Sequence, residues 1–182
     1  SGLGFADPFD REGTPRVSVP LVEGGIARAA LYDRVYAARA RRRGHDVTST
    51  GSALVPEFGA EGGVGPVALH LASGSAASVA ELLGGLDRGL YVRRLNYVNG
   101  YVEPRRSRMT GLTRDGCFLV ERGAIGRPVG NLRMTDSFLE MLARADAMTA
   151  ARAAVASSWT QGGTLVVPAV RFRAVRFTSG SR

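Results

Sequence analysis

Three rare side chains in this sequence have the chemistry of a metal ligand or a nucleophile: His45, His70 and Cys117. A zinc site needs several converging His, Cys, Asp or Glu ligands, most recognisably two histidines at helical spacing, and neither histidine has such a partner. Leu69 and Leu71 flank His70 and place it on the solvent face of an expected strand. His45 follows a glycine that ends an expected helix. We therefore expect both histidines to be exposed and neither to bind a metal.

Cys117 is the single cysteine, and it precedes the apolar run Phe118-Leu119-Val120. This setting is typical of a thiol that packs as a small hydrophobic residue. Its spacing leaves a Cys–His pair open as a weaker alternative. The Gly-x-Ser-x-Gly pattern of a serine nucleophile does not occur. The residues alone thus indicate no self-contained active site.

The basic residues suggest a second kind of chemistry, the binding of phosphates. The net charge is +8, and all 24 basic residues are arginine. Arg105, Arg106 and Arg108, beside tyrosines 97 and 101, are a candidate nucleic-acid patch. Isoleucine and asparagine are scarce too, which favours a coding bias, and we do not expect a nucleic-acid partner. The three arginines remain candidates for contact with an acidic partner surface.

The elements expected in the first half of the chain include two helices with clear capping residues. Asp33 can cap a helix that runs through Arg43 and stops at Gly44. A second helix, capped by Ser75 or Ser78, is expected to end near Asp87. Around them we expect strands over 16–21 and 26–31 with a turn at Glu23-Gly24-Gly25, a loop over 45–66 and a strand over 66–71.

The second half of the chain indicates a β-meander over residues 90–133. Its expected turns are Asn99-Gly100, Asp115-Gly116 and Arg122-Gly123. Residues 135–137 then cap a third helix, a linker covers 149–163, and a strand covers 165–177 with a bulge near Ala174. The apolar spacing places one face of the third helix in the core, with the residues Phe138, Leu139, Leu142, Ala145 and Met148.

These elements predict one α+β domain over residues 1–182, with a mainly antiparallel sheet of meander or barrel-like form and two or three helices. No apolar run has the length of a membrane span, so we expect no membrane association. No signal peptide is visible, and one cysteine cannot form an internal disulfide. We therefore expect a cytoplasmic protein.

Several segments together resemble the C-terminal domain of the TldD/PmbA (TldE) family of metallopeptidases, formerly described as modulators of DNA gyrase. They follow in the family's order from residue 7 to about 177. The similar segments are Asp7–Pro15, Val19–Ile26, Tyr32–Arg39, Thr48–Gly51, Gly89–Val92, Thr110–Gly116, Phe118–Gly123 and Pro128–Arg133.

The resemblance implies a role in the proteolysis of unfolded or precursor peptides. In this family a TldD–TldE pair is active, and only TldD carries zinc, on two histidines of an HExxxH helix in the N-terminal half and on a loop cysteine. This chain has no HExxxH, and residues 150–163, where that cysteine would fall, contain Trp159 and no cysteine. We expect the family's N-terminal half to be absent from this chain.

The resemblance therefore predicts a metal-free, TldE-like domain that is not active alone. We expect no cofactor in this chain, with zinc in the parent protein or the partner subunit, and a homo- or heterodimer with a TldD/PmbA-like subunit. One alternative is an active zinc peptidase whose HExxxH lies upstream and which recruits Cys117. A further alternative is a nucleic-acid or gyrase-associated binding module.

The meander supplies the candidate residues for binding a peptide substrate or a partner. For Asp115, we favour the interpretation that Arg114-Asp115-Gly116 is only a tight turn, with Asp115 bonded to its own backbone. For Arg133, a structural and a binding role are about equally supported. The full set is Tyr91, Tyr97, Arg114, Asp115, Asn131 and Arg133.

Overall fold

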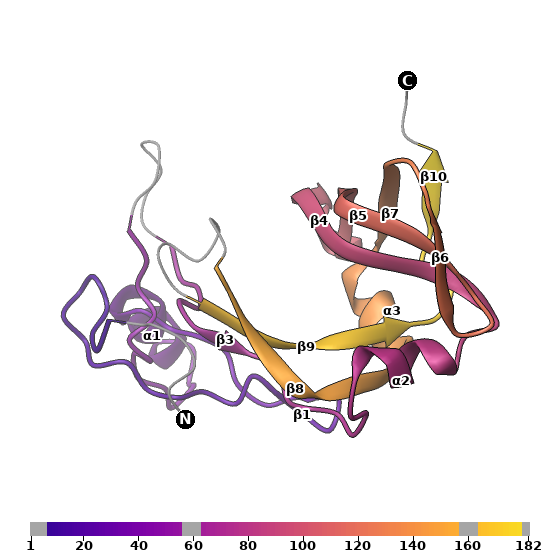
Figure 1. Ribbon diagram of the computed structural model, residues 1–182. Coiled ribbons are helices and arrows are strands. Elements are labelled where there is room, and N and C mark those ends of the chain that lie inside the picture. The colour runs from indigo at the N-terminus through magenta and orange to yellow at the C-terminus, as the bar shows by residue number, and fades with distance from the viewer. Residues whose placement is uncertain (1–6, 56–62, 157–163, 180–182) are drawn as a thin grey trace. The chain divides into compact units, whose positions relative to one another are not determined.

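The computed structural model describes residues 7–55, 63–156 and 164–179 (Figure 1). The chain divides into two compact units. The first contains the described residues up to Leu71 and those between Ala153 and Val167. The second contains those from Ala72 to Arg152 and from Pro168 onward. No helix in the described ranges is long and apolar enough to cross a membrane.

The first unit begins with a small hairpin. Strands β1 (Val22–Glu23) and β2 (Ile26–Ala27) pair antiparallel across Gly24 and Gly25, which both have positive φ. The turn lies where expected. The ladder is shorter than predicted and lies next to the turn, so the expected strand over 16–21 is wrong.

Helix α1 (Arg34–Arg41) confirms the capping prediction. The Asp33 carboxylate accepts a 2.6 Å hydrogen bond from the Tyr36 N–H, and the chain leaves the helix through Gly44 at φ +88°. Asp10, which is 3% exposed, joins the segment before α1 to the loop after it. The Asp10 carboxylate accepts hydrogen bonds from the backbone N–H groups of Glu12 and Thr14 before the helix and of Ala53 after it.

The second unit begins with helix α2 (Val79–Gly84), for which Ser78 rather than Ser75 is the cap. Ser78 accepts from the N–H of Glu81, and the Glu81 side chain accepts from the N–H of Ala77. The helix ends at Gly84, three residues before the predicted end.

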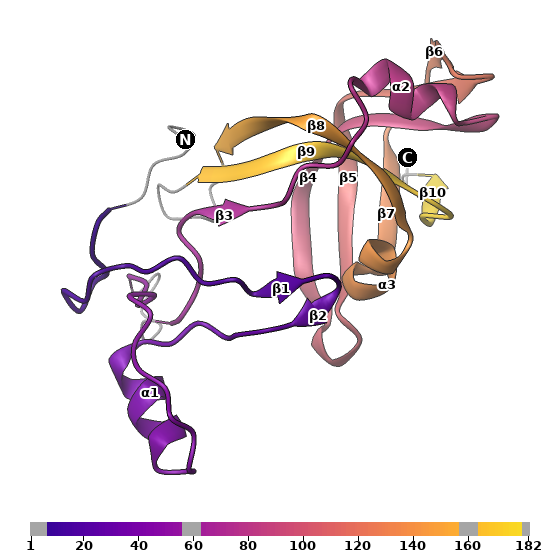
Figure 2. The ribbon, with the colours of Figure 1, turned by 90° about the horizontal axis from the view of Figure 1, so that it is seen from below.

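A five-stranded antiparallel sheet forms the centre of the second unit. The order is β10-β7-β5-β4, with β6 also paired to β5, and Figure 2 shows β4, β5 and β7 side by side. The strands are β4 (Arg88–Glu103), β5 (Arg108–Glu121), β6 (Ala124–Pro128), β7 (Leu132–Ser137) and β10 (Phe177–Ser179), and the 3₁₀ turn η1 (Pro104–Arg106) joins β4 to β5.

Of the three turns predicted for the meander, only Arg122-Gly123 is a turn, at φ 50° and 77°. Asn99-Gly100 lies within β4, and Asp115-Gly116 lies within β5. At Asp115 the ladder shifts: β4 advances from Val92 to Arg94 while β5 advances from Cys117 to Arg114. The extra residue makes a bulge, and an Asp-Gly pair with positive φ suits a bulge as well as a turn.

Helix α3 (Phe138–Ala143) begins after Ser137 as expected, but its predicted buried face is wrong. Met141 is 9% exposed, whereas Phe138, Leu139 and Leu142 are 45%, 64% and 39% exposed. The helix is too short to present the predicted stripe, because the chain turns into a strand after Arg144. Ala145 and Met148 belong to that strand.

The last strands connect the two units. Strands β8 (Ala145–Ala156) and β9 (Thr164–Phe172) lie in a three-stranded sheet with β3 (Leu69–His70), and β3 pairs parallel with β9. Residues 149–156 are thus a strand rather than the predicted linker, and 157–163 lie outside the described residues. The predicted bulge near Ala174 is a full break, because Ala174 has φ 52° and the chain then joins β7 as β10.

The fold class is therefore α+β with mainly antiparallel strands, as predicted. The barrel-like form is not seen, because the sheets of the described residues stay open. In the second unit the buried core centres on Thr113, Val120 and Met134, each with 0% exposure.

Candidate functional site

Two of the six candidate residues, Arg114 and Arg133, lie on one exposed face of the main sheet. Arg114 is opposite Arg94 on β4, and Arg133 is opposite Leu112 on β5. Side chains of directly paired residues share a face, as do residues two apart on a strand, so all four point the same way. Arg133 donates a 3.2 Å hydrogen bond to the Thr110 hydroxyl.

Asp115 is not a turn residue, so the interpretation favoured from the sequence is wrong. It lies at the β5 bulge with φ 60°, and its carboxylate forms a 2.6 Å ion pair with the Arg94 guanidinium. Both side chains are more than half exposed. The pair neutralises one arginine of the exposed face.

The other candidates are dispersed. The Tyr91 ring packs at 6.3 Å from the Phe118 ring. Tyr97 is 78% exposed at φ 52°, and Asn131 is exposed just before β7.

The basic turn residues Arg106 and Arg108 both pair with Glu103, at 3.2 Å and 3.7 Å, which reduces the positive charge at that turn.

The sequence did not reveal a cavity of about 860 Å³ in the second unit. Its walls come from α2, the first half of β4 and residues 169–175, with contributions from β7, α3 and β10. Apolar side chains make up most of this lining, among them Leu82, Leu90, Val92, Met134, Met141 and Phe172.

The cavity reaches the open edge of β4 and also extends over one face of the main sheet. All eight residues from Arg88 to Leu95 line it, and so do all residues from Ala169 to Val175. Because neighbouring residues of a strand alternate between its faces, a cavity touched by consecutive residues reaches the edge of that strand. Met134 on β7 and Phe177 on β10 line the cavity from the face of the sheet. In the described part of the chain, β5 is the only strand beside β4, and β3 meets β9 only at Leu165 and Val166.

The charged residues that line the cavity are all arginines: Arg88, Arg93, Arg94, Arg171 and Arg173. Three of them have acidic partners. Asp146 binds Arg171 at 2.8 Å and Arg173 at 2.7 Å, and Asp115 binds Arg94. Arg171 also donates to the Leu82 carbonyl, and its side chain is only 19% exposed.

The hydrogen bonds from Arg171 and Arg173 lower the pKa of Asp146 to about 2, so this carboxylate stays ionised at neutral pH. Asp146 itself raises the pKa of Arg171. Arg88 and Arg93 are exposed, and no acidic partner is seen for either among residues 7–55, 63–156 and 164–179. These two arginines are therefore available to an anionic ligand.

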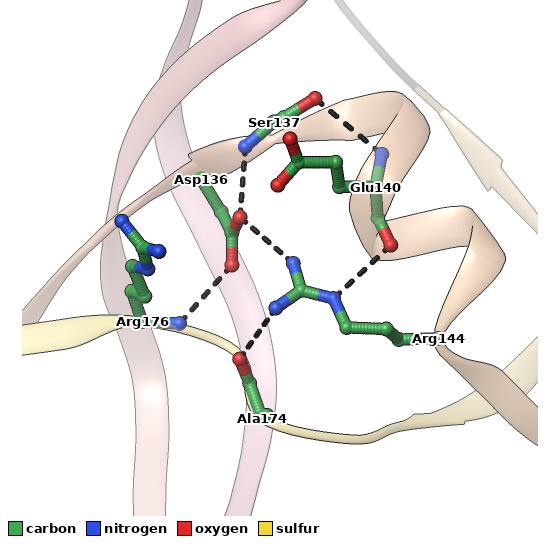
Figure 3. Close-up of polar contacts among 6 residues, drawn as sticks. All are labelled: Asp136, Ser137, Glu140, Arg144, Ala174 and Arg176. Carbon is green, nitrogen blue, oxygen red and sulfur yellow. Dashed lines mark hydrogen bonds and ion pairs between the residues drawn. The ribbon is translucent and has the colours of Figure 1, made fainter.

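A buried ion pair fixes the chain next to the cavity (Figure 3). Asp136 is 4% exposed and accepts hydrogen bonds from the Arg144 guanidinium at 2.8 Å and from the N–H groups of Ser137 and Arg176. Arg144 donates in turn to the carbonyls of Glu140 and Ala174. Burial raises the pKa of Asp136, but these donors outweigh it and hold the pKa below its usual value.

Of the three residues that the sequence offered as metal ligands, only Cys117 is buried. His45 and His70 are exposed, as predicted, whereas Cys117 is 4% exposed. Burial raises the pKa of the Cys117 thiol, against the effect of a hydrogen bond with Thr113, and so favours the protonated thiol. The described residues contain no group of three or more His, Cys, Asp or Glu side chains placed to hold a metal.

Comparison with solved structures shows the same fold in longer proteins. TldE from Thermococcus kodakarensis matches with a TM-score of 0.77 and 19% identity, over 96% of this chain and 36% of that chain. A suggested modulator of DNA gyrase from Thermotoga maritima matches with a TM-score of 0.72 and 22% identity, over 94% of this chain and 35% of that one. Another, from Bacteroides thetaiotaomicron, matches with a TM-score of 0.64 and 20% identity, over 96% and 33%.

This chain thus spans about a third of the length of the solved structures it matches. No curated protein matches it. The family comparison covers nearly the whole sequence: residues 1–179 match the PmbA/TldA metallopeptidase C-terminal domain. The chain belongs to this family, as its sequence motifs predicted.

Proposed function

We propose that this chain is the C-terminal domain of a metal-free, TldE-like subunit, which supports the proteolysis of unfolded or precursor peptides by docking a partner and holding an extended peptide. The observation that carries this proposal is that β4 has an open edge and that the cavity reaches it. An exposed strand edge offers unpaired N–H and C=O groups, which bind an extended peptide as an added strand.

The cavity suits this binding mode because it is bounded by strand residues on two sides. A peptide laid along Arg88–Leu95 would hydrogen-bond to β4 and place alternate side chains among the apolar residues. Backbone hydrogen bonding is independent of sequence. It therefore suits a domain that handles many unfolded peptides.

The exposed apolar side chains of α3 support the docking of a partner. Phe138, Leu139 and Leu142 are each more than a third exposed on a helix of six residues. Exposed apolar clusters of this kind mark protein interfaces. We propose a TldD/PmbA-like subunit as the partner, with zinc on that subunit and none on this chain.

Peptide addition to β4 can be tested with backbone-modified peptides. A neutral decapeptide that alternates Leu or Val with Gln is titrated into the chain, and amide NMR shifts are followed. We expect the shifts to concentrate on Arg88–Leu95. Two further peptides carry N-methyl groups on either the odd or the even amides. Because alternate amides of an added strand point toward its neighbour, one N-methylated series should lose binding and the other should keep it.

Equal binding by both N-methylated peptides, or shifts located away from β4, would refute strand addition.

The metal-free assignment has its own test, the zinc content of the purified chain. Stoichiometric zinc that disappears in a Cys117→Ser variant would overturn it and would favour the alternative in which Cys117 is a ligand.

A further inference from the structure

We infer that the cavity beside β4 selects peptides in which two acidic residues flank a four-residue apolar segment. This inference rests on the proposed function, because it assumes that a peptide adds to the β4 edge. It goes further by naming the chemical class of peptide and the two arginines that recognise it, Arg88 and Arg93.

The charge of the cavity lining supports the acidic part of this pattern. Among the described residues, the five charged side chains that line the cavity are all arginines, and no aspartate or glutamate lines it. Arg171 and Arg173 already share the Asp146 carboxylate, and Arg94 pairs with Asp115. Arg88 and Arg93 are exposed and have no acidic partner in the part of the chain that the structure describes. A carboxylate on the ligand would complete their pairing.

The spacing of these two arginines sets the spacing of the acidic residues. Both lie on β4, five residues apart. The pairing with β5 is regular from Arg88 to Val92 and shifts between Val92 and Arg94, where the extra residue lies on β5 and not on β4. A peptide strand beside β4 advances one residue for each residue of β4, and directly opposite side chains share a face. Acidic residues opposite Arg88 and Arg93 are therefore separated by four residues and point to opposite faces.

The residues between the two arginines support the apolar part of the pattern. Gly89, Leu90, Tyr91 and Val92 all line the cavity and carry no charge. Across from them, Met134, Met141 and Phe172 add apolar surface. Charged side chains placed there would lose water without gaining a partner, whereas apolar side chains gain from burial.

The inference is tested by fluorescence anisotropy with labelled peptides and the full chain at low salt. The first peptide has Glu at two positions separated by four apolar residues, and the second has Gln at both positions. We expect the Glu peptide to bind roughly 2- to 30-fold more tightly, the range for two exposed ion pairs. This preference should shrink as salt is added, because salt screens exposed charges.

The matched variants are R88Q/R93Q and R42Q/R43Q. Both remove two exposed arginines, but Arg42 and Arg43 follow α1 in the other unit and do not line the cavity. The preference for the Glu peptide should disappear in R88Q/R93Q and persist in R42Q/R43Q. A third peptide, with three residues between its glutamates, places both on one face and should lose part of the preference.

Three results would overturn the inference, and the first two differ in what they say about the proposed function. If the Glu and Gln peptides bind equally to the β4 edge, the acidic selection is wrong and strand addition stands. If neither peptide binds, strand addition fails as well. Loss of the preference in R42Q/R43Q would attribute it to net charge and would also refute the role of Arg88 and Arg93.

Discussion

Replacement of Asp136 by Asn tests whether the buried ion pair stabilises the second unit. The Asp136 carboxylate is 4% exposed and binds Arg144 and two backbone N–H groups. Asp136→Asn keeps the size of the side chain and removes its charge. It leaves the Arg144 guanidinium partly buried with neutral acceptors alone, namely the Asn side-chain oxygen and the carbonyls of Glu140 and Ala174.

The expected loss follows from this burial. Removing one partner of a buried ion pair costs about 3–5 kcal/mol, and we expect the lower end, about 3 kcal/mol, because the Arg144 side chain retains partial access to water. In a chain of this size that loss lowers the melting temperature by roughly 6–12 °C. Urea unfolding followed by circular dichroism gives the change in the free energy of unfolding.

Asp115→Asn is the matched control, because it breaks an ion pair of similar length, with Arg94, in which both side chains are more than half exposed. Exposed pairs contribute about 0.2–1 kcal/mol, so this variant should unfold nearly as the parent does. Equal losses in the two variants would refute the reasoning that burial gives the Asp136 pair its strength. A coupling energy near zero between Asp136→Asn and Arg144→Met would refute it as well.

Three further predictions concern pH, backbone conformation and the thiol. Burial raises the pKa values of Asp10 and Asp136, but the hydrogen-bond donors around them outweigh burial and hold both pKa values below the ordinary value of an aspartate. The stabilisation from these carboxylates is therefore present above that ordinary value and is lost as the pH falls through the lower folded-state values. Acid unfolding of Asp136→Asn should consequently depend less steeply on pH in that range. Gly51→Ala should lower the free energy of unfolding in urea more than Gly44→Ala does. Both positions have positive φ, which costs Ala about 1–2 kcal/mol, but a Cβ at Gly51 would also lie 2.7 Å from the Arg16 Cα, whereas the space at Gly44 is open. Equal losses in the two variants would contradict this packing argument. Cys117 should react with a thiol reagent at pH 8 many times more slowly in the folded chain than in urea, because burial shields the thiol and raises its pKa. Equal rates in the folded and the unfolded chain would show that the folded chain exposes this thiol.

The sequence predicted best the features that depend on a few neighbouring residues. Asp33 caps α1 and Ser137 caps α3, because an N-cap needs only a short polar side chain and an N–H group three residues later. The predictions of turns at Gly24-Gly25 and Arg122-Gly123 were also confirmed, because such a turn depends on positive φ at adjacent residues. The Asp115-Gly116 prediction failed because positive φ at such a pair also suits a bulge, and only the partner strand decides between them.

The candidate site depends on contacts that are distant in the sequence. Arg114 and Arg133 share a face because of the β5–β7 register, which no local pattern specifies. The cavity joins residues from Val79 to Phe177. The run from Arg88 to Leu95, with arginines on both sides of an apolar stretch, was a visible signal. Its role as a binding edge depends on the position of β4 at the edge of its sheet, which the local sequence does not specify.

The bulge at Asp115 sets the register of half of the main sheet. If β5 paired with β4 without the bulge, Leu95 would face Arg114 instead of Thr113, and Thr113 would face Asn96. The hydroxyl now at 0% exposure would turn outward, and an arginine would enter the core in its place. Deletion of Asp115 would remove the extra residue and keep Leu95 opposite Thr113, so it should be less harmful than a one-residue deletion elsewhere in β5. In related sequences, a one-residue difference in the length of β5 should therefore occur at this point.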